Sequence, residues 1–297
     1  MIRLRKILCP LDFSKCSDNA LKNAIVIAEK YDAELHLFHA ILMFEDEAYQ
    51  SDDRVPDFKQ SYDILSEISD AKLSALVKEK SENVKMKSIS RRGFSASEEI
   101  LDYSEEEGID LIVVGTHGKS TIRHFLLGSV AEKILRLAQC PVMTVREDTE
   151  TLGTHNHILI PIDFSEYSNK ALAYGLEVAS TYGLRVTLMH VIERVNHPSF
   201  YGASIFEITS RLKDQSLEVM REIRANAGFE DVETDYVVKE GKPAHQIVEY
   251  AEVNDFDLLV IATHGLSGIE HFLMGSTTEK VIQNINIPVL VVKKTAE

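Results

Sequence analysis

Short, nearly continuous runs of apolar residues recur along the chain, and longer amphipathic stretches separate them. The runs hardly alternate between apolar and polar positions, which is typical of strands covered on both faces and therefore of a parallel sheet. The stretches between them have the apolar spacing of helices, as at residues 20–28 and 171–179. The pattern predicts strands near residues 6–11, 34–40, 84–91, 110–115 and 141–146, and again near 157–162, 185–191, 232–239, 257–262 and 288–293.

The two sets of five strands belong to two copies of one unit. Residues 7–14 read Ile-Leu-Cys-Pro-Leu-Asp-Phe-Ser, and residues 158–165 read Ile-Leu-Ile-Pro-Ile-Asp-Phe-Ser. Strands that alternate with helices in this way predict a doubly wound α/β domain, present twice in tandem. The repeat, with a polar stretch between its copies, predicts a first domain at 1–147, a linker at 148–155 and a second domain at 156–297.

A set of spaced glycines follows the fourth strand of each copy. Residues 115–129 read Gly-Thr-His-Gly, nine further residues and Gly-Ser, and residues 262–276 read Ala-Thr-His-Gly with the same spacing and ending. Ligands of doubly wound sheets bind beyond the carboxyl ends of the strands, where a glycine lets backbone approach them closely. A helix that begins at each Gly-Ser would offer free N–H groups to a phosphate. The motif therefore predicts nucleotide binding, and helix capping by Ser129 and Ser276 is the structural alternative.

Further polar residues stand at the ends of the predicted strands. Asp12 and Asp163 end the first strands, where a carboxylate either accepts hydrogen bonds from ribose or only marks the start of a helix. His39 and His190 end the second strands, and we expect them to form hydrogen bonds near the sheet edge. His117 and His264 lie within the glycine loops, and we expect them to order those loops.

The two copies differ within the motif. Ala262 takes the place of Gly115, and Leu266 takes the place of Lys119. We expect the methyl group of the alanine to narrow the second loop, and the lysine to add a cation near a polyphosphate in the first. The first site is therefore predicted to bind a nucleotide more tightly than the second.

On these residues, both halves resemble the universal stress protein family, whose ATP-binding members carry Gly-x2-Gly-x9-Gly-Ser/Thr. The resemblance includes the Pro-x-Asp-Phe-Ser opening and covers essentially the whole chain. It implies a five-stranded parallel sheet in the order 3-2-1-4-5, with helices on both faces, in each domain. The ligand that it implies is ATP or another adenine nucleotide, with Mg²⁺ as a candidate companion ion.

The resemblance also implies which residues surround the nucleotide. The first site would comprise Pro10, Asp12, Ala40, Gly115, Thr116, His117, Gly118, Gly128, Ser129 and Val130. The second would comprise Pro161, Asp163, Val191, Ala262, Thr263, Gly265, Gly275, Ser276 and Thr277. In both, the aspartate would lie near ribose, the residue after the second-strand histidine near adenine, and the glycine loop near the phosphates.

Composition and charge narrow the range of partners. The chain has 297 residues and a formal net charge of −15, and it contains no basic run, so nucleic acid is not an expected partner. No apolar run reaches the roughly 18 residues that a membrane span requires, and the start lacks the apolar stretch of a signal peptide, so we expect a cytoplasmic protein. Cys9, Cys16 and Cys140 form no Cys-x-x-Cys pair, which favours a reducing compartment. We expect Cys9 and Cys140 in the core, and no motif specifies a metal site.

Three classes of function remain open at this point. The preferred one is a stress-response regulatory protein that binds an adenine nucleotide and acts on an unidentified protein partner. The others are a slow ATPase or phosphotransferase and a structural partner protein with vestigial pockets. Hydrolysis needs a positioned water, a base and cationic charge on the phosphoryl group, and the motif supplies no complete set, so no catalytic residue is assigned. The last strands, after Pro141 and Pro288, are expected to pair as an internal pseudo-dimer, and a homodimer of the whole chain is a further option.

Overall fold

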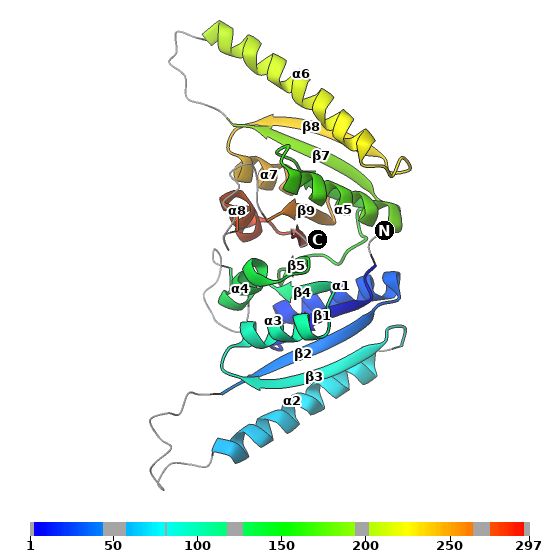
Figure 1. Cartoon of the computed structure of the whole chain (residues 1–297), viewed down its shortest axis with the longest axis vertical. Helices are drawn as coiled ribbons and strands as arrows, with labels where there is room; N and C mark the ends of the chain where they lie inside the picture. Colours follow the sequence, from blue (N-terminus) through cyan, green and yellow to red (C-terminus); the bar gives the residue numbers. More distant parts are fainter. Residues whose placement is uncertain are drawn as a thin grey trace. The chain divides into compact units, whose positions relative to one another are not determined.

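Figure 1 shows the computed structural model of the chain, which describes residues 3–43, 58–80, 82–117, 127–193, 202–263 and 274–293. These residues belong to two compact units, one within Arg3–Glu147 and one within Asp148–Glu297. Each unit has its own five strands and four helices among the described residues. The motif residues Gly118, Lys119, His264, Gly265 and Leu266 lie outside the described ranges.

The first unit alternates strands and helices, as the sequence predicts. Its elements are β1 (Lys6–Pro10), α1 (Lys15–Tyr31), β2 (Glu34–Leu42), α2 (Phe58–Lys80), β3 (Met86–Gly93), α3 (Ala96–Glu106), β4 (Leu111–Gly115), α4 (Ser129–Leu137) and β5 (Val142–Val145). The strand order is β3-β2-β1-β4-β5, and all neighbours are parallel. α1 and α2 pack on one face, and α3 and α4, which contact each other, cover the opposite face, because right-handed crossovers run to both sides of β1.

The second unit repeats this topology. Its elements are β6 (His157–Pro161), α5 (Glu166–Tyr182), β7 (Arg185–Ile192), α6 (Gly202–Asn226), β8 (Thr234–Glu240), α7 (Pro243–Glu252), β9 (Leu258–Ala262), α8 (Ser276–Asn284) and β10 (Val289–Val292). Its strand order is β10-β9-β6-β7-β8, again entirely parallel, so the predicted order 3-2-1-4-5 is confirmed in both copies. None of the helices in the described part of the chain combines the length and the apolar character needed to cross a bilayer.

The central strands are buried on both faces, which explains why their sequences do not alternate. Ile7, Leu8 and Cys9 of β1 are completely buried. The third strands begin two residues later than predicted, because Val84 and Val232 are buried but precede the hydrogen-bonded ladder. Apolar pattern alone thus marks where the chain enters the core, and pairing with the neighbouring strand decides where the strand begins.

Aspartates before β4 and β9 hold the start of each unit's first strand. Asp110 Oδ2 accepts hydrogen bonds from the N–H groups of Arg5 and Lys6, at 2.7 and 3.0 Å. Asp257 does the same in the second unit with a larger set of backbone donors. Its Oδ1 accepts from Gly153, Thr154 and His155 at 3.0, 2.6 and 2.9 Å, and its Oδ2 accepts from His157 at 3.0 Å. The predicted linker is therefore tied to the second unit over its last three residues.

Candidate functional site

A cavity of about 350 Å³ lies at the carboxyl ends of β1, β2 and β4 in the first unit. This volume falls within the range of small-molecule sites, about 300–1,000 Å³. Apolar wall is supplied by Phe38, Ile100 and Val114. The cavity brings together every predicted first-site residue that the structure describes: Pro10, Asp12, Ala40, Gly115, Thr116, His117, Gly128, Ser129 and Val130.

The amino-terminal end of α4 lines this cavity with backbone donors. Glu132 makes the first hydrogen bond within the helix, from its N–H to the carbonyl oxygen of Gly128 at 2.9 Å. The N–H groups of Ser129, Val130 and Ala131 therefore have no acceptor within the helix, and all three residues line the cavity. Unpaired N–H groups at the positive end of a helix dipole form an anion site.

The alternative in which Ser129 and Ser276 cap their helices is wrong. The capping positions belong to Gly128 and Gly275, and the serines are the first residues inside α4 and α8. Gly128 takes this place because its N–H donates to the Thr116 carbonyl oxygen at 2.8 Å, and a Cβ there would lie only 3.0 Å from that oxygen. Among the described residues, the Ser129 hydroxyl makes no hydrogen bond.

The first glycine of the motif is needed for packing against α1. A Cβ at Gly115 would lie 3.0 Å from Sγ and 3.1 Å from the carbonyl carbon of Cys16. That direction leads to α1, on the sheet face opposite α4. By the internal repeat, the methyl group of Ala262 points at α5, where Tyr167 replaces the cysteine. The geometry therefore does not support the expectation that this methyl group narrows the second loop.

The cysteines are placed differently from one another. Cys9 is fully buried in β1, and burial raises the pKa of its thiol far above the ordinary range. Cys16 is also buried, and its Sγ donates to the carbonyl oxygen of Val145 at 3.2 Å. Cys140 is only half-buried and precedes β5, so the expectation of a core position is confirmed for Cys9 and is wrong for Cys140.

Asp12 lies in a tight turn between β1 and α1. Its Oδ1 accepts a hydrogen bond from the N–H of Ser14 at 3.0 Å, and Ser14 caps α1. Phe13 between them has a φ of 59°, a left-handed conformation that is rare for a bulky residue. Asp163 makes the same turn with Ser165 in the second unit. Each aspartate thus starts a helix, as the structural alternative proposed, while Asp12 also lines the cavity.

His39 forms the predicted hydrogen bond at the sheet edge. Its Nδ1 donates to the carbonyl oxygen of Leu11 at 2.6 Å, and its ring lies 4.7 Å from that of Phe13. His190 repeats this arrangement with the carbonyl oxygen of Ile162 at 2.8 Å. The prediction for both histidines is confirmed.

Ala40, the next residue, presents unpaired backbone to the cavity. Even-numbered residues of β2 face β1: Glu34 donates to the Arg5 carbonyl oxygen at 2.8 Å, and the Phe38 carbonyl oxygen accepts from Leu11 at 2.7 Å. The N–H and C=O of Ala40 point to the same side, but β1 ends at Pro10 and provides no strand opposite them. Within the described ranges, neither group makes a backbone hydrogen bond on that side.

The second unit holds the predicted second-site residues at equivalent positions. At the ends of β6, β7 and β9 and the start of α8 lie Pro161, Asp163, Val191, Ala262, Thr263, Gly275, Ser276 and Thr277. Gly275 donates to the Thr263 carbonyl oxygen at 2.8 Å, as Gly128 does to that of Thr116. One difference is a threonine hydroxyl, that of Thr278, which donates to the Ala262 carbonyl oxygen at 2.8 Å.

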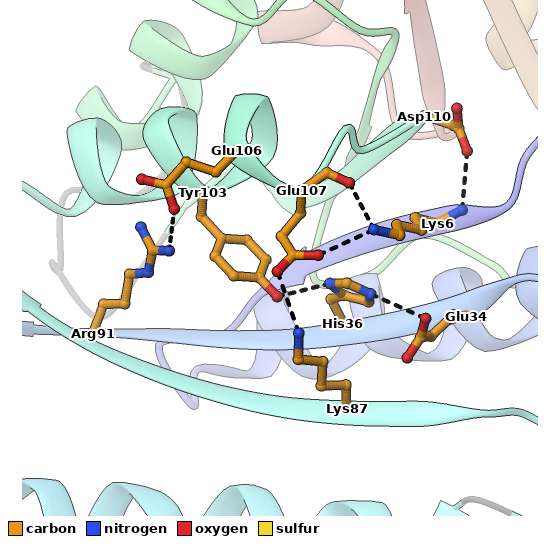
Figure 2. A network of polar contacts seen from close by, with 9 residues as sticks. All are labelled: Lys6, Glu34, His36, Lys87, Arg91, Tyr103, Glu106, Glu107 and Asp110. Carbon is orange, nitrogen blue, oxygen red and sulfur yellow. Dashed lines mark hydrogen bonds and ion pairs between the residues drawn. The ribbon is translucent and has the colours of Figure 1, made fainter.

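Sequence reasoning missed a polar network at the amino-terminal ends of the strands in the first unit (Figure 2). Lys6 Nζ lies 3.0 Å from Oε2 of Glu107, Lys87 Nζ lies 3.4 Å from Oε1, and both lysines lower the pKa of that carboxyl. Nearby, Nδ1 of His36 and the hydroxyl of Tyr103 lie 2.8 Å apart, and burial lowers the pKa of His36. These residues come from five separate elements or loops, so no local sequence motif predicts the network.

Comparison with known proteins identifies similar chains. The sequence model described as "Universal stress protein family" matches residues 3–146 and 154–293. A universal stress protein of Methanocaldococcus jannaschii is 33% identical over 141 residues, which cover 47% of this chain and 83% of that protein. One of Mycobacterium bovis is 26% identical over 191 residues, which cover 63% of this chain and 62% of that protein. The crystal structure of a universal stress protein from Archaeoglobus fulgidus has the same fold, with a TM-score of 0.73, 22% identity and coverage of 98% of this chain and 99% of that chain.

Proposed function

The chain belongs to the universal stress protein family, and on that basis we propose that it is a regulatory protein that binds an adenine nucleotide in its first unit. The observation that carries the proposal is one cavity with two kinds of unpaired backbone. Ala40 offers an N–H and a C=O side by side, and the start of α4 offers three N–H groups. An adenine base and a polyphosphate are the two parts of one ligand that match these groups.

The base would pair with Ala40 along its Watson–Crick edge. The C=O of Ala40 would accept from the N6 amino group of adenine, and its N–H would donate to N1. The apolar residues Ile100 and Val114, which line the cavity, would pack on the ring. The carboxylate of Asp12 would accept from ribose hydroxyls.

The phosphates would lie at the amino-terminal end of α4. The three N–H groups of residues 129–131 would donate to phosphate oxygens, and the Ser129 hydroxyl would add a fourth donor. Mg²⁺ would enter with the nucleotide, because this ion is commonly held by substrate phosphates and few protein ligands. In the described ranges, no three histidine, cysteine or acidic side chains gather where they could hold a metal ion.

A regulatory role is favoured over an enzymatic one by the groups in the cavity. His117 is the one described imidazole beside the start of α4, and its Nδ1 lies 2.9 Å from the Thr116 hydroxyl. Asp12 lines the same cavity, but no hydrogen bond joins its carboxylate to this imidazole among the described residues, and an imidazole without such a partner does not complete a phosphoryl-transfer site. We propose that the bound nucleotide changes the surface offered to a protein partner, with slow hydrolysis as the second candidate.

The test is to identify and count what the protein binds. The chain is purified and denatured, and released small molecules are separated by chromatography; the nucleotide-free chain is then titrated with ATP, ADP, AMP, cyclic AMP and GTP in a calorimeter. We expect adenine nucleotides to bind and GTP to bind less tightly. A folded chain that releases no nucleotide and shows no heat of binding with any adenine nucleotide at millimolar concentration would contradict the proposal.

A further inference from the structure

The parallel ladder between β1 and β2 stops one hydrogen bond early. After the Leu11 N–H has donated to the Phe38 carbonyl oxygen, a regular ladder would continue from the Ala40 N–H to the Leu11 carbonyl oxygen. That oxygen instead accepts from Nδ1 of His39, at 2.6 Å. Because a carbonyl oxygen can only accept, Nδ1 must carry the proton. The imidazole N–H of His39 therefore takes the place that the backbone N–H of Ala40 would have in a regular ladder.

The same replacement occurs in the second unit. The Ile162 N–H donates to the Met189 carbonyl oxygen at 2.8 Å, and the Ile162 carbonyl oxygen accepts from Nδ1 of His190 at 2.8 Å. Val191 is left in the position of Ala40. Each imidazole is held by a phenylalanine in the left-handed region, Phe13 or Phe164, with ring centroids 4.7 and 4.3 Å apart. The same rare backbone conformation occurs at Phe13 and at Phe164, and in each unit it places a phenylalanine ring against the imidazole.

We propose that His39 is a positioning residue, which keeps the Ala40 amide unpaired and thereby sets the selectivity of the site for the base. The inference rests on the proposed function, since it concerns the same cavity. An unpaired N–H beside an unpaired C=O matches the N1 acceptor and N6 donor of adenine. Guanine in the same orientation would set its O6 against the C=O and its N1–H against the N–H, and both contacts are repulsive. The imidazole thus acts on the base through the Leu11 carbonyl oxygen.

Two substitutions separate this role from a general structural one. His39→Phe keeps an aromatic ring against Phe13 but removes the donor to Leu11. His39→Asn loses the ring but retains an amide N–H close to the position of Nδ1. The first read-out is hydrogen exchange of the Ala40 amide, resolved by NMR in the nucleotide-free chain, with the Val191 amide of the untouched second unit as the internal control.

We expect exchange at Ala40 to become slower in His39→Phe, because its N–H is then free to complete the ladder to Leu11. A merely structural role predicts the reverse, since loosening the strand end would speed exchange. In His39→Asn the Ala40 amide should exchange as in the wild-type chain. Val191 should not change in either variant.

The second read-out is calorimetric titration with ATP, GTP and inorganic triphosphate. In His39→Phe we expect the affinity for ATP to fall by roughly three- to tenfold, the size of one neutral hydrogen bond, and the preference for ATP over GTP to shrink by the same factor. Triphosphate, which would contact only the start of α4, should bind unchanged. His39→Asn should restore both the affinity for ATP and the preference.

The outcomes distinguish the two levels of the argument. If the wild-type chain binds ATP but exchange at Ala40 is unchanged or faster in His39→Phe, the positioning role is overturned and the proposed function stands. The same holds if exchange slows and the ratio of ATP to GTP affinity does not move. If the wild-type chain binds no nucleotide at all, the proposed function fails, and the inference about base selectivity fails with it.

Discussion

Replacing Ser129 with proline removes a single backbone donor from the start of α4 and leaves the helix able to form. Proline is well tolerated at the first position of a helix, where its missing N–H has no helical partner. The preceding residue, Gly128, has φ −62° and ψ 141°, the extended conformation that a residue before proline prefers. The free energy of unfolding should therefore change little, by about 0.5 kcal/mol or less for a substitution that breaks no interaction within the fold.

The expected loss of affinity follows from the number of donors. Three N–H groups, of Ser129, Val130 and Ala131, lack a helical acceptor and line the cavity. A hydrogen bond to a charged group is worth about 1.5–3 kcal/mol, so the loss of one donor should raise the Kd for ATP by roughly tenfold to a hundredfold. The loss falls on the phosphates, so adenosine should bind Ser129→Pro and the wild-type chain equally.

Isothermal titration with ATP and adenosine measures both quantities, and circular dichroism with thermal unfolding verifies the fold. Ser129→Ala is the matched control, since it removes the hydroxyl and keeps the N–H. The reasoning is refuted if Ser129→Pro, correctly folded, binds ATP like the wild-type chain. It is also refuted if Ser129→Ala loses as much affinity as the proline variant, because the hydroxyl would then account for the effect.

Three further predictions concern turnover, the two copies and pH. Even with ATP bound, hydrolysis should stay far below the roughly 10 s⁻¹ typical of enzymes; steady turnover near that rate, lost on mutation of the cavity, would reverse this expectation. Because the first motif carries Lys119 where the second carries Leu266, we expect calorimetric titration to show that Gly118→Val loses the tighter ATP site and Gly265→Val the weaker one, and the opposite assignment would reverse the ranking of the halves. Burial lowers the pKa of His157 from 6.5 to about 4, so the unfolded chain binds the extra proton first and the second unit should lose stability, by about 2–3 kcal/mol, as the pH falls from 6.5 to 4. Chemical unfolding across that range should show this slope in the wild-type chain and lack it in His157→Gln; an equal slope in both would contradict the assignment.

The fold could be predicted because its main determinants are local and repeated. Runs such as Ile7–Cys9 are buried on both faces, so apolar and polar residues do not alternate in them, which predicts a parallel sheet. Duplication of the whole pattern doubles the evidence for each element. The ends of the strands are predicted less accurately, because the first hydrogen bond of β3 depends on where β2 lies and not on the residues of β3 itself.

The sequence anticipates which residues meet at the cavity of the first unit, while their role in binding stays a prediction. Gly115 and Gly128 of the motif line one cavity, and both glycines are required by contacts that sequence spacing does not reveal, with Cys16 and with the Thr116 carbonyl oxygen. The unpaired amide of Ala40 was equally hidden, because it depends on which groups the neighbouring strand has left unused. Such features arise from pairs of distant residues, and a single chain read along its length gives no measure of them.

The carboxylate of Asp257 decides where the chain can be cut to study its second half alone. This side chain is buried, and it accepts from Gly153, Thr154 and His155 through one oxygen and from His157 through the other. A fragment that starts at residue 156 would strip three donors from a buried charge, at a cost on the order of several kcal/mol. A fragment or a circular permutant that starts before residue 153 keeps them. The residue at which the second half can begin is therefore determined by a side chain about a hundred residues further along the chain. A truncation placed from the sequence repeat alone would remove the hydrogen-bond donors of that side chain.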